Sequence, residues 1–388
     1  MKTPTLRRHV SGRAYTRFKG KCTYFGKFGT EEAQQRFQQW LADMDLVEDK
    51  FRHVSLLLLA AKFMDHAEVH YRKNGVPTGE ANNIRLAMRT ACTMYGNSRV
   101  SEFGPKRLKA VRNQMIQDGL CRNTVNARIR RIRHVFKWGV SEQLVPVSVL
   151  VGLQTVQGLE AGRTSARETD PVEPVAELDI LALEPYVSRP VWGLIQFMLL
   201  TGARPGEAVR LRWCDIDAES DVWVYRPNQH KTEHHGKSRR ILIGPRAQVM
   251  ITQFAGSDQN YVFRPADAPG SGGNVGDHYS RESYRTAVIR ACEKAFGCPA
   301  ELRIDNGRKP YAGESADELQ ERRDRAKAWR AKNCWSPNQL RHNNGTEVRK
   351  LGGIETAQVI LGHTSVKTTE RYAETNIDGA IAHVRQFG

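Results

Sequence analysis

Residues 199–211 have the sequence Leu-Leu-Thr-Gly-Ala-Arg-Pro-Gly-Glu-Ala-Val-Arg-Leu. The apolar run of residues 191–200 overlaps the start of this segment and predicts a buried helix. The helix is expected to end at Gly202, since glycine accepts the left-handed conformation of a helix end. Pro205 suits the first turn of a new helix. We therefore expect Arg204 at a corner between two packed helices, where a fixed guanidinium suits bidentate contact with a phosphate. An arginine in a turn is more often a plain surface residue, so this corner alone does not decide the function.

A polar loop between two strand-like segments supplies a candidate lysine. Residues 222–226 and 240–243 have the β-branched and aromatic content of strands, and the polar segment between them contains Gly236. This pattern predicts a β-hairpin with Lys231 near its tip. A lysine on a hairpin can reach into a cleft, although a solvated loop lysine is the commoner case.

A long helix is predicted to begin at Ser336-Pro337. Asn338 and Arg341 are three residues apart, so they share one face near the N-terminus of this helix, where the backbone favours anions. Gly352-Gly353 is expected to end the helix.

Two shorter helices are predicted after that break. The first covers residues 354–361 and ends at Gly362, which is followed by His363. Ser365 can cap the second, which carries Tyr372.

The charge balance points to a polyanionic partner. The chain has 388 residues, which suggests two or three domains. Its 59 Lys and Arg exceed its 42 Asp and Glu, giving a net charge of +17. Such an excess favours nucleic acid ahead of an anionic membrane. Many basic proteins bind no polyanion, so composition alone leaves both readings open.

Composition also argues against several classes of protein. No apolar run approaches the ~20 residues that a membrane span needs, and the segment MKTPTLRRHVSG lacks the apolar core of a secretion signal. The seven cysteines form no CxxC pair, and the histidines do not cluster with them at metal spacing. We therefore expect reduced thiols, no bound metal and a cytoplasmic location.

Positive charge is concentrated at the N-terminus. Residues 1–30 contain eight Lys and Arg and no acidic residue, with aromatic residues between them. We interpret residues 1–45 as a basic N-terminal arm-like segment. It forms either a small strand-rich module or a flexible tail.

Residues 46–156 are expected to form a helical core DNA-binding domain. Within it, residues 105–137 contain ten Lys and Arg against one acidic residue. A helix beginning near Thr124 has an apolar face formed by Val125, Ile129, Ile132 and Phe136. The candidate contacts to a DNA backbone lie off that face and are Arg128, Arg131 and Lys137. A solvated helix face is the alternative.

Residues 157–178 contain Gly, Ser, Thr and Pro without periodicity, which is typical of a linker. A C-terminal domain, residues 179–388, follows the linker. It contains a polar, charge-balanced insertion near residues 298–335, where Ser315 and Glu318 predict a capped, solvated helix.

Four motifs together resemble the phage-integrase, or tyrosine recombinase, family. Residues 199–211 resemble its first arginine box, and Asn338-Gln-Leu-Arg341-His resembles its His-x-x-Arg box. Leu361-Gly-His363, followed nine residues later by Tyr372, resembles its third box and nucleophile. The resemblance covers about residues 170–380 well, and residues 50–145 by position and charge. It implies a mainly α fold with a small antiparallel β-sheet (α+β), made of a helical core-binding domain and a catalytic domain.

The resemblance also implies a chemistry. Tyr372 would attack a scissile DNA phosphate while Arg204 and Arg341 clamp its non-bridging oxygens. The product is a 3′-phosphotyrosyl intermediate, so the chain would be a site-specific recombinase or integrase that needs no cofactor. Guanidiniums beside the phosphate neutralise charge in the transition state, and the covalent intermediate conserves bond energy.

Three further roles follow from the resemblance, and one position departs from it. Lys231 would protonate the leaving 5′ oxygen, His363 would hydrogen-bond the phosphate, and Glu207 would support the first arginine. Asn338 stands where the family usually has histidine. An amide can donate a hydrogen bond to phosphate but cannot shuttle a proton, and His342 would point about 100° away on the helix.

Two other functions remain open beside the recombinase. Asn338 motivates a DNA-binding protein of the same fold with weak or no catalysis, such as a regulator or accessory factor. A type IB-like topoisomerase would use similar chemistry.

Double-stranded DNA is the expected partner, and the chain is expected to be nucleoid-associated. Recombination joins two duplexes with four active sites, so we expect a homotetramer on paired sites and a monomer in solution. Residues 377–387 have apolar residues at helical spacing. By resemblance this tail would dock on a neighbouring subunit, and packing on its own domain is the equal alternative.

Overall fold

The computed structural model divides the chain into two compact units, Met1–Asp170 and Pro171–Gly388. The residues whose structure is described are 4–18, 20–51, 53–73, 75–227, 239–254, 256, 260–269, 276–306 and 310–370. Within these ranges, no helix is both long and apolar enough to cross a membrane. The division falls inside the segment 157–178 that we expected to be a linker.

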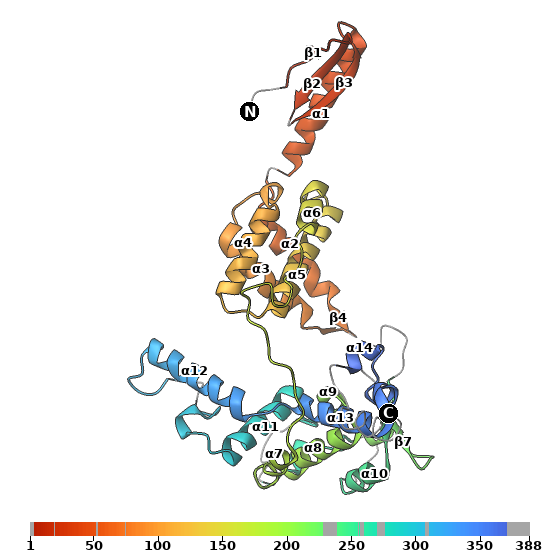
Figure 1. Ribbon diagram of the computed structural model, residues 1–388, viewed down its shortest axis with the longest axis vertical. Coiled ribbons are helices and arrows are strands. Elements are labelled where there is room, and N and C mark those ends of the chain that lie inside the picture. The colour runs from red at the N-terminus through yellow and green to blue at the C-terminus, as the bar shows by residue number, and fades with distance from the viewer. Residues whose placement is uncertain are drawn as a thin grey trace, which may run out of the picture. The chain divides into compact units, whose positions relative to one another are not determined.

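The N-terminal segment forms a small sheet packed on a helix (Figure 1). The elements are β1 (Arg7–Arg8), β2 (Arg13–Phe18), β3 (Lys21–Lys27) and α1 (Glu31–Lys50). The strands pair antiparallel in the order β1-β2-β3. Ala14 and Phe25 of the sheet bury against Ala33 and Phe37 of the helix. Residues 7–27 are therefore a strand-rich module and not a flexible tail, and the expected boundary at residue 45 falls inside α1.

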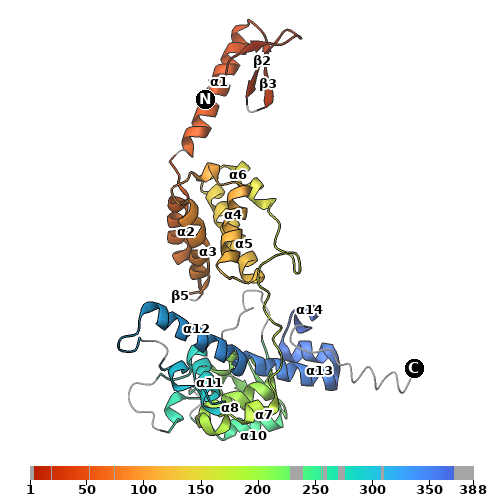
Figure 2. The same cartoon turned by 60° about the vertical axis from the view of Figure 1, so that its left-hand side comes forward.

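A helical bundle makes up the rest of the first unit (Figure 2). Its elements are α2 (Leu56–His70), β4 (Arg72–Lys73), β5 (Val76–Pro77), α3 (Glu80–Tyr95), the 3-10 turn η1 (Val100–Glu102), α4 (Pro105–Gln117), α5 (Arg122–Ser141) and α6 (Val147–Gln154). The four apolar residues predicted to share a face of α5 are all buried. The helix begins at Arg122, earlier than the expected start near Thr124, because Cys121 already has the extended conformation of an N-cap.

The second unit is built around the buried helix α8 (Arg189–Thr201), which packs against α10 and α13. Its other helices are α7 (Glu177–Leu181), α9 (Pro205–Ala208), α10 (Pro245–Thr252), α11 (Arg281–Ala295), α12 (Ala316–Asn333), α13 (Pro337–Leu361) and α14 (Val366–Thr369). Its 3-10 turns are η2 (Glu184–Tyr186), η3 (Trp213–Asp215), η5 (Pro265–Asp267) and η6 (Ala300–Leu302).

A three-stranded antiparallel sheet completes this unit. The strands are β6 (Ile216–Asp217), β7 (Trp223–Tyr225) and β8 (Ile241–Ile243), in the order β6-β7-β8. Tyr225 pairs with Ile241, so β7 and β8 are the two strands expected to flank the hairpin. Lys231, expected near the tip of that hairpin, lies outside the described residues.

Helix α13 bends sharply at Gly353, whose φ of 79° and ψ of 176° are not helical. In a straight helix, Arg341 and Leu361 would lie about 30 Å apart, at a rise of about 1.5 Å per residue. Instead, the Arg341 guanidinium donates a hydrogen bond of 2.5 Å to the Leu361 carbonyl. The bend therefore brings the two ends of α13 together.

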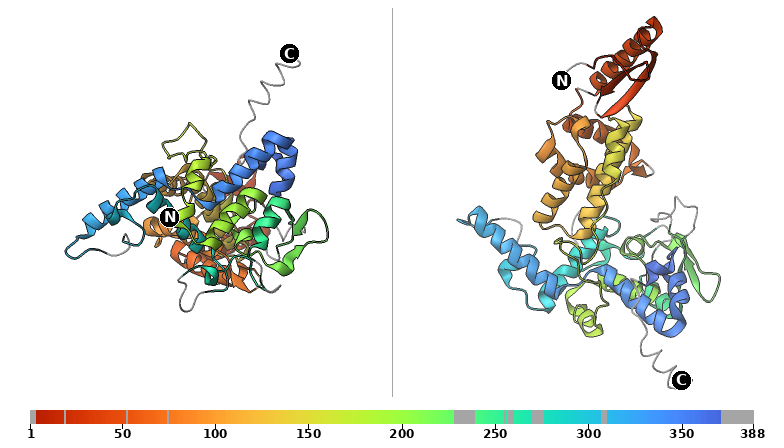
Figure 3. Two further views of the ribbon diagram at one scale, coloured as in Figure 1. Left: turned by 90° about the horizontal axis from the view of Figure 1, so that it is seen from below. Right: turned by 45° about the horizontal axis from the view of Figure 1, so that its top comes forward.

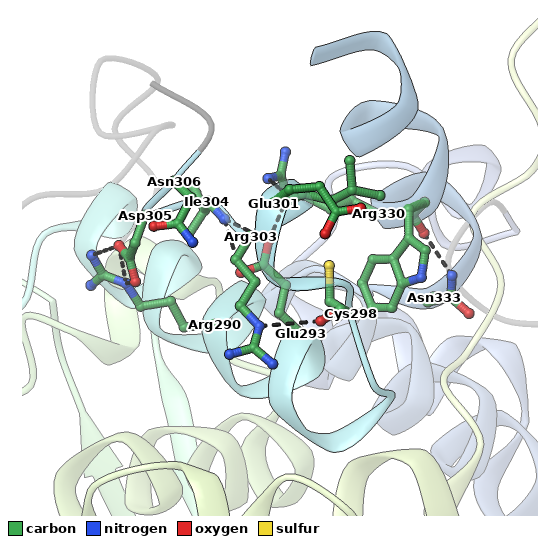
Figure 4. A network of polar contacts seen from close by, with 12 residues as sticks. Arg290, Glu293, Cys298, Glu301, Arg303, Ile304, Asp305, Asn306, Arg330 and Asn333 are labelled. Carbon is green, nitrogen blue, oxygen red and sulfur yellow. Dashed lines mark hydrogen bonds and ion pairs between the residues drawn. The ribbon is translucent and has the colours of Figure 1, made fainter. Parts of the chain in front are cut away.

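The polar insertion is a folded element that is fixed to α11. The carboxylate of Glu293, which is 2% exposed, accepts hydrogen bonds from the Arg330 Nε at 2.7 Å and from the Ile304 backbone at 3.0 Å (Figure 4). The predicted capping box of Ser315 and Glu318 is present at the start of α12. The helix contacts α11 and η6, and its N-terminal end points away from the other helices of its unit (Figure 3).

Candidate anion-binding site

Arg204 lies at the corner that the sequence predicted. Gly202 ends α8 with a φ of 63°, and Arg204 is the N-cap of α9. The Arg204 Nη1 donates to Glu207 Oε1 at 2.7 Å, and its backbone N–H donates to Glu207 Oε2 at 2.9 Å. Glu207 thus holds both the backbone and the side chain of Arg204, as a supporting residue would.

The Glu207 carboxylate is buried and remains ionised. Burial by itself would raise the pKa of Glu207, but the charges of Arg239 and Arg204 outweigh it and hold this pKa below its ordinary value. The backbone of the same residue accepts a hydrogen bond of 3.0 Å from the Tyr225 hydroxyl. Strand β7 therefore helps to fix the corner.

Arg341 is wholly buried beneath this corner. Its guanidinium donates to the Gly202 carbonyl at the end of α8 and to the Leu361 carbonyl at the end of α13. Its Nη2 lies 2.9 Å from His363 Nε2. The Arg341 guanidinium thereby joins the first half of α13 to the end of α8 and to the end of α13. The three groups that it contacts there are uncharged.

His363 is held as a neutral imidazole. Burial comes first among the causes, followed by the charges of Arg341, Arg204 and Arg239, and together they lower the pKa of His363 to about 4. Because the Arg341 Nη2 is a donor, the facing Nε2 of His363 must be the acceptor. The ring proton therefore lies on Nδ1, which is 3.1 Å from Thr369 Oγ1 and can donate to it.

Arg239 also belongs to this cluster, although no sequence motif indicated it. Its side chain is 4% exposed, and its Nε lies 3.6 Å from Glu207 Oε1. Its Nη1 donates to the Ile360 carbonyl at 3.1 Å and to the Arg240 carbonyl at 3.0 Å. The alternation of side chains along a strand could have predicted that Arg239 points inward. Arg239 precedes Ile241 by two residues, and both side chains are buried.

Asn338 and His342, which flank Arg341 in the segment 338–342, have different surroundings from Arg341. Asn338 is half-buried one turn before Arg341, and its side chain makes no hydrogen bond within the described part of the chain. His342 is buried, and burial followed by the charge of Arg341 lowers the pKa of His342 to about 4. The structure thus gathers Arg204, Glu207, Arg341 and His363, whereas Tyr372 lies beyond its described part.

The three cations expected to face DNA on α5 differ from one another. Lys137 is exposed. Arg131 instead forms a bidentate ion pair with Glu80, at 2.7 and 2.8 Å. Arg128 is half-buried, and burial followed by the charge of Arg89 lowers the pKa of Arg128.

The exposed stripe of α5 runs through Arg130, His134 and Lys137, at helical spacing. Arg130 and His134 also line a hollow of about 330 Å³ together with Tyr71, Glu80 and Arg131. The periodicity of α5 correctly predicted its buried face. It could not predict that Glu80, on another helix, would pair with Arg131.

Among the solved structures with a similar fold are integrases bound to DNA. The Tn1549 transposon integrase in complex with transposon right-end DNA superposes with a TM-score of 0.58 and 16% identity, over 86% of this chain and 99% of that one. A lambda integrase dimer on a COC′ core site gives 0.59 and 14%, over 95% and 94%. A lambda integrase tetramer on a Holliday junction gives 0.54 and 13%, over 95% and 94%.

The chain therefore has the fold of the tyrosine recombinases, and the expected mainly α architecture with a small antiparallel sheet is confirmed. No protein-family model matches the sequence. No curated protein matches it either.

Proposed function

We propose that this chain is a site-specific DNA recombinase or integrase that cuts and rejoins DNA through a 3′-phosphotyrosyl intermediate. The observation that carries the proposal is that Arg204, held by Glu207, lies beside the buried Arg341 and its partner His363. The two arginines come from segments more than 100 residues apart, and the hydrogen bond from Arg341 to the Gly202 carbonyl joins those segments. A phosphodiester has the charge and the shape that two neighbouring guanidiniums can bind through paired hydrogen bonds.

The proposed chemistry assigns a role to each residue. The Tyr372 phenolic oxygen attacks the phosphorus and loses its proton to solvent water, and the bond between phosphorus and the 5′ oxygen breaks. Lys231 supplies a proton to that leaving oxygen. Arg204 and Arg341 neutralise the charge that builds on the non-bridging oxygens, which is where preorganised donors contribute most. The second half of the reaction reverses these steps on a new 5′ hydroxyl.

The tautomer of His363 couples phosphate binding to protonation. In the free protein its Nε2 accepts from Arg341, so it has no proton to offer a phosphate oxygen. An anion between the arginines would raise the pKa of His363 by offsetting their field, the second cause of its depression. Binding of the scissile phosphate is therefore expected to be accompanied by proton uptake below about pH 6.5, the ordinary His pKa.

Double-stranded DNA is the proposed partner, and the first unit, Met1–Asp170, supplies a surface for it outside the phosphate site. The exposed stripe of α5 and the strand-rich module at the N-terminus supply cations that a DNA backbone would attract. We propose a monomer in solution and a homotetramer on paired sites, in a cytoplasmic, nucleoid-associated protein. Log affinity should fall linearly with log salt concentration, since each neutralised phosphate releases counterions.

A covalent-adduct experiment tests the proposal. The full chain is incubated with nicked suicide duplexes taken from the DNA on either side of its own gene, and products are separated on a denaturing gel. We expect a DNA–protein adduct with the natural chain and none with Tyr372→Phe, Arg204→Ala or Arg341→Ala. An adduct that persists in Tyr372→Phe would remove that residue from its role.

Asn338 favours a second candidate, a DNA-binding protein of the same fold with little or no catalysis. Tight binding without adduct on any duplex would support it. The matched experiment is Asn338→His, which restores a group able to shuttle a proton. Gain of adduct in this variant would attribute the low activity to this one position.

A further inference from the structure

Arg239 contacts two parts of the site at once. It directly follows the segment 228–238 and precedes β8, so its backbone is fixed by the strand that pairs with β7. Its side chain runs inward, with Nε facing Glu207 and Nη1 bonded to Ile360. Glu207 belongs to the corner at Arg204, and Ile360 lies at the end of α13, so the Arg239 guanidinium contacts both parts of the site.

We propose that Arg239 is a positioning residue of the phosphodiester site, which holds Glu207 and the Ile360–His363 turn in one fixed arrangement. This inference rests on the proposed function. Through Glu207 it controls the direction of Arg204, and through the end of α13 it controls His363. It also adds positive charge behind the place where the phosphate would bind.

The sharing of Glu207 supports this role. Its Oε1 lies 2.7 Å from Arg204 Nη1 and 3.6 Å from Arg239 Nε, so one carboxylate serves two guanidiniums. The Arg239 Nη2 is buried and has no hydrogen-bond partner among the described residues. A side chain kept only for stability would be expected to satisfy its buried donors. An unsatisfied guanidinium donor beside a shared carboxylate instead indicates positive charge that is available to an anion when one binds.

The close approach of α13 supports it too. Gly362 has a φ of 61°, and a Cβ added there would lie 2.3 Å from Arg239 Nη1. The turn is thus packed directly against the guanidinium. The carbonyl of the next residue, His363, accepts a hydrogen bond of 3.1 Å from Gln358, which fixes the backbone on the other side. A change of shape at Arg239 would therefore be transmitted to the imidazole.

The test compares three variants of the full chain. Arg239→Met keeps the length of the side chain but removes its charge and donors. Arg239→Lys keeps the charge but not the fork that reaches Glu207 and Ile360 together. Arg240→Met is the matched control, because the neighbouring side chain is exposed.

Three measurements are made on each variant: the single-turnover rate of adduct formation, the DNA dissociation constant, and the pKa of His363 by NMR titration. We expect Arg239→Met to slow adduct formation about 100-fold, the size of effect that a small misplacement of catalytic groups produces. Arg239→Lys should lie between it and the natural chain, while DNA affinity changes little. The pKa of His363 should rise in Arg239→Met, since the charge of Arg239 is among the causes that lower it.

The outcomes distinguish a failure of the proposed function from a failure of the role inferred for Arg239. If the natural chain forms no adduct on any duplex, the proposed function fails, and the NMR titration still tests the arrangement around His363. If the natural chain forms adduct and Arg239→Met matches Arg240→Met in both rate and His363 pKa, the inference is overturned. If Arg239→Met does not fold, Arg239→Lys decides, and a natural rate in that variant overturns the inference.

Discussion

Glu207→Gln should destabilise the C-terminal unit, and the size of the effect follows from the contacts of the carboxylate. Glutamine has nearly the same shape, and its carbonyl oxygen can still accept the backbone N–H of Arg204. The substitution removes only the charge. Arg204 and Arg239 then face each other across a neutral group, with side chains 28% and 4% exposed.

The expected loss is about 3 kcal/mol of unfolding free energy. Removing one partner of a buried ion pair costs about 3–5 kcal/mol, because the remaining charge stays buried without compensation. Water reaches part of the Arg204 side chain, which places the loss at the lower end of this range. The Arg239 side chain is almost fully buried, so water does not solvate its charge.

The effect should also depend on pH in one direction. The folded-state pKa of Glu207 is lowered from 4.5, so its contribution is present above that pH and is lost as the pH falls through the lowered value. The natural chain and the variant should therefore converge in acid.

Urea denaturation followed by tryptophan fluorescence measures this difference. Five of the seven tryptophans lie in the second unit, at 192, 213, 223, 329 and 335, so the signal mainly reports that unit. Glu219→Gln is the control, because this glutamate lies in the same unit and its side chain is exposed. Unfolding free energies of Glu207→Gln and Glu219→Gln that agree within about 0.5 kcal/mol would refute the reasoning.

Three further outcomes are expected. Gly202→Ala should cost more than about 1 kcal/mol, because a φ of 63° disfavours alanine and its Cβ would lie 2.4 Å from Asn344 Oδ1; an unchanged urea midpoint would contradict this. Lowering the pH from about 6.5 towards 4 should destabilise the fold, since the His363 pKa of about 4 means that the unfolded chain binds this proton first; a pH titration of stability checks it, and His363→Gln should reduce the slope. Arg330→Met should leave Glu293 buried without its cation and cost about 3–5 kcal/mol locally, seen as faster hydrogen exchange in α12; unaltered protection would count against the ion pair.

Helix ends were the most predictable part of the fold. Gly202, Gly353 and Gly362 all have positive φ, of 63°, 79° and 61°, and the sequence predicted a helix end at each. The reason is local, because only glycine adopts this conformation without strain. The buried face of α5 was equally predictable from its periodicity.

Local sequence patterns could not predict which residues come together in the site. The bond from Arg341 to the Gly202 carbonyl joins residues 139 positions apart, and no spacing rule predicts it. Only the combination of several motifs, through their resemblance to one family, joined these residues. Arg239 was missed because it lies in none of those motifs, and the pairing of Arg131 with Glu80 was missed because it crosses 51 positions between two helices.

The bend at Gly353 has a consequence for how this part of the chain can change in length. The arm from residue 354 to Leu361 returns to Arg341 over a fixed number of helical residues. Inserting or deleting one residue in that arm would rotate everything beyond it by about 100° and shift it by about 1.5 Å, which would aim the Leu361 carbonyl away from Arg341. Substitutions on the outer side of this arm, such as at Val359, are tolerable, whereas indels there should be selected against even though the arm itself is exposed on that side.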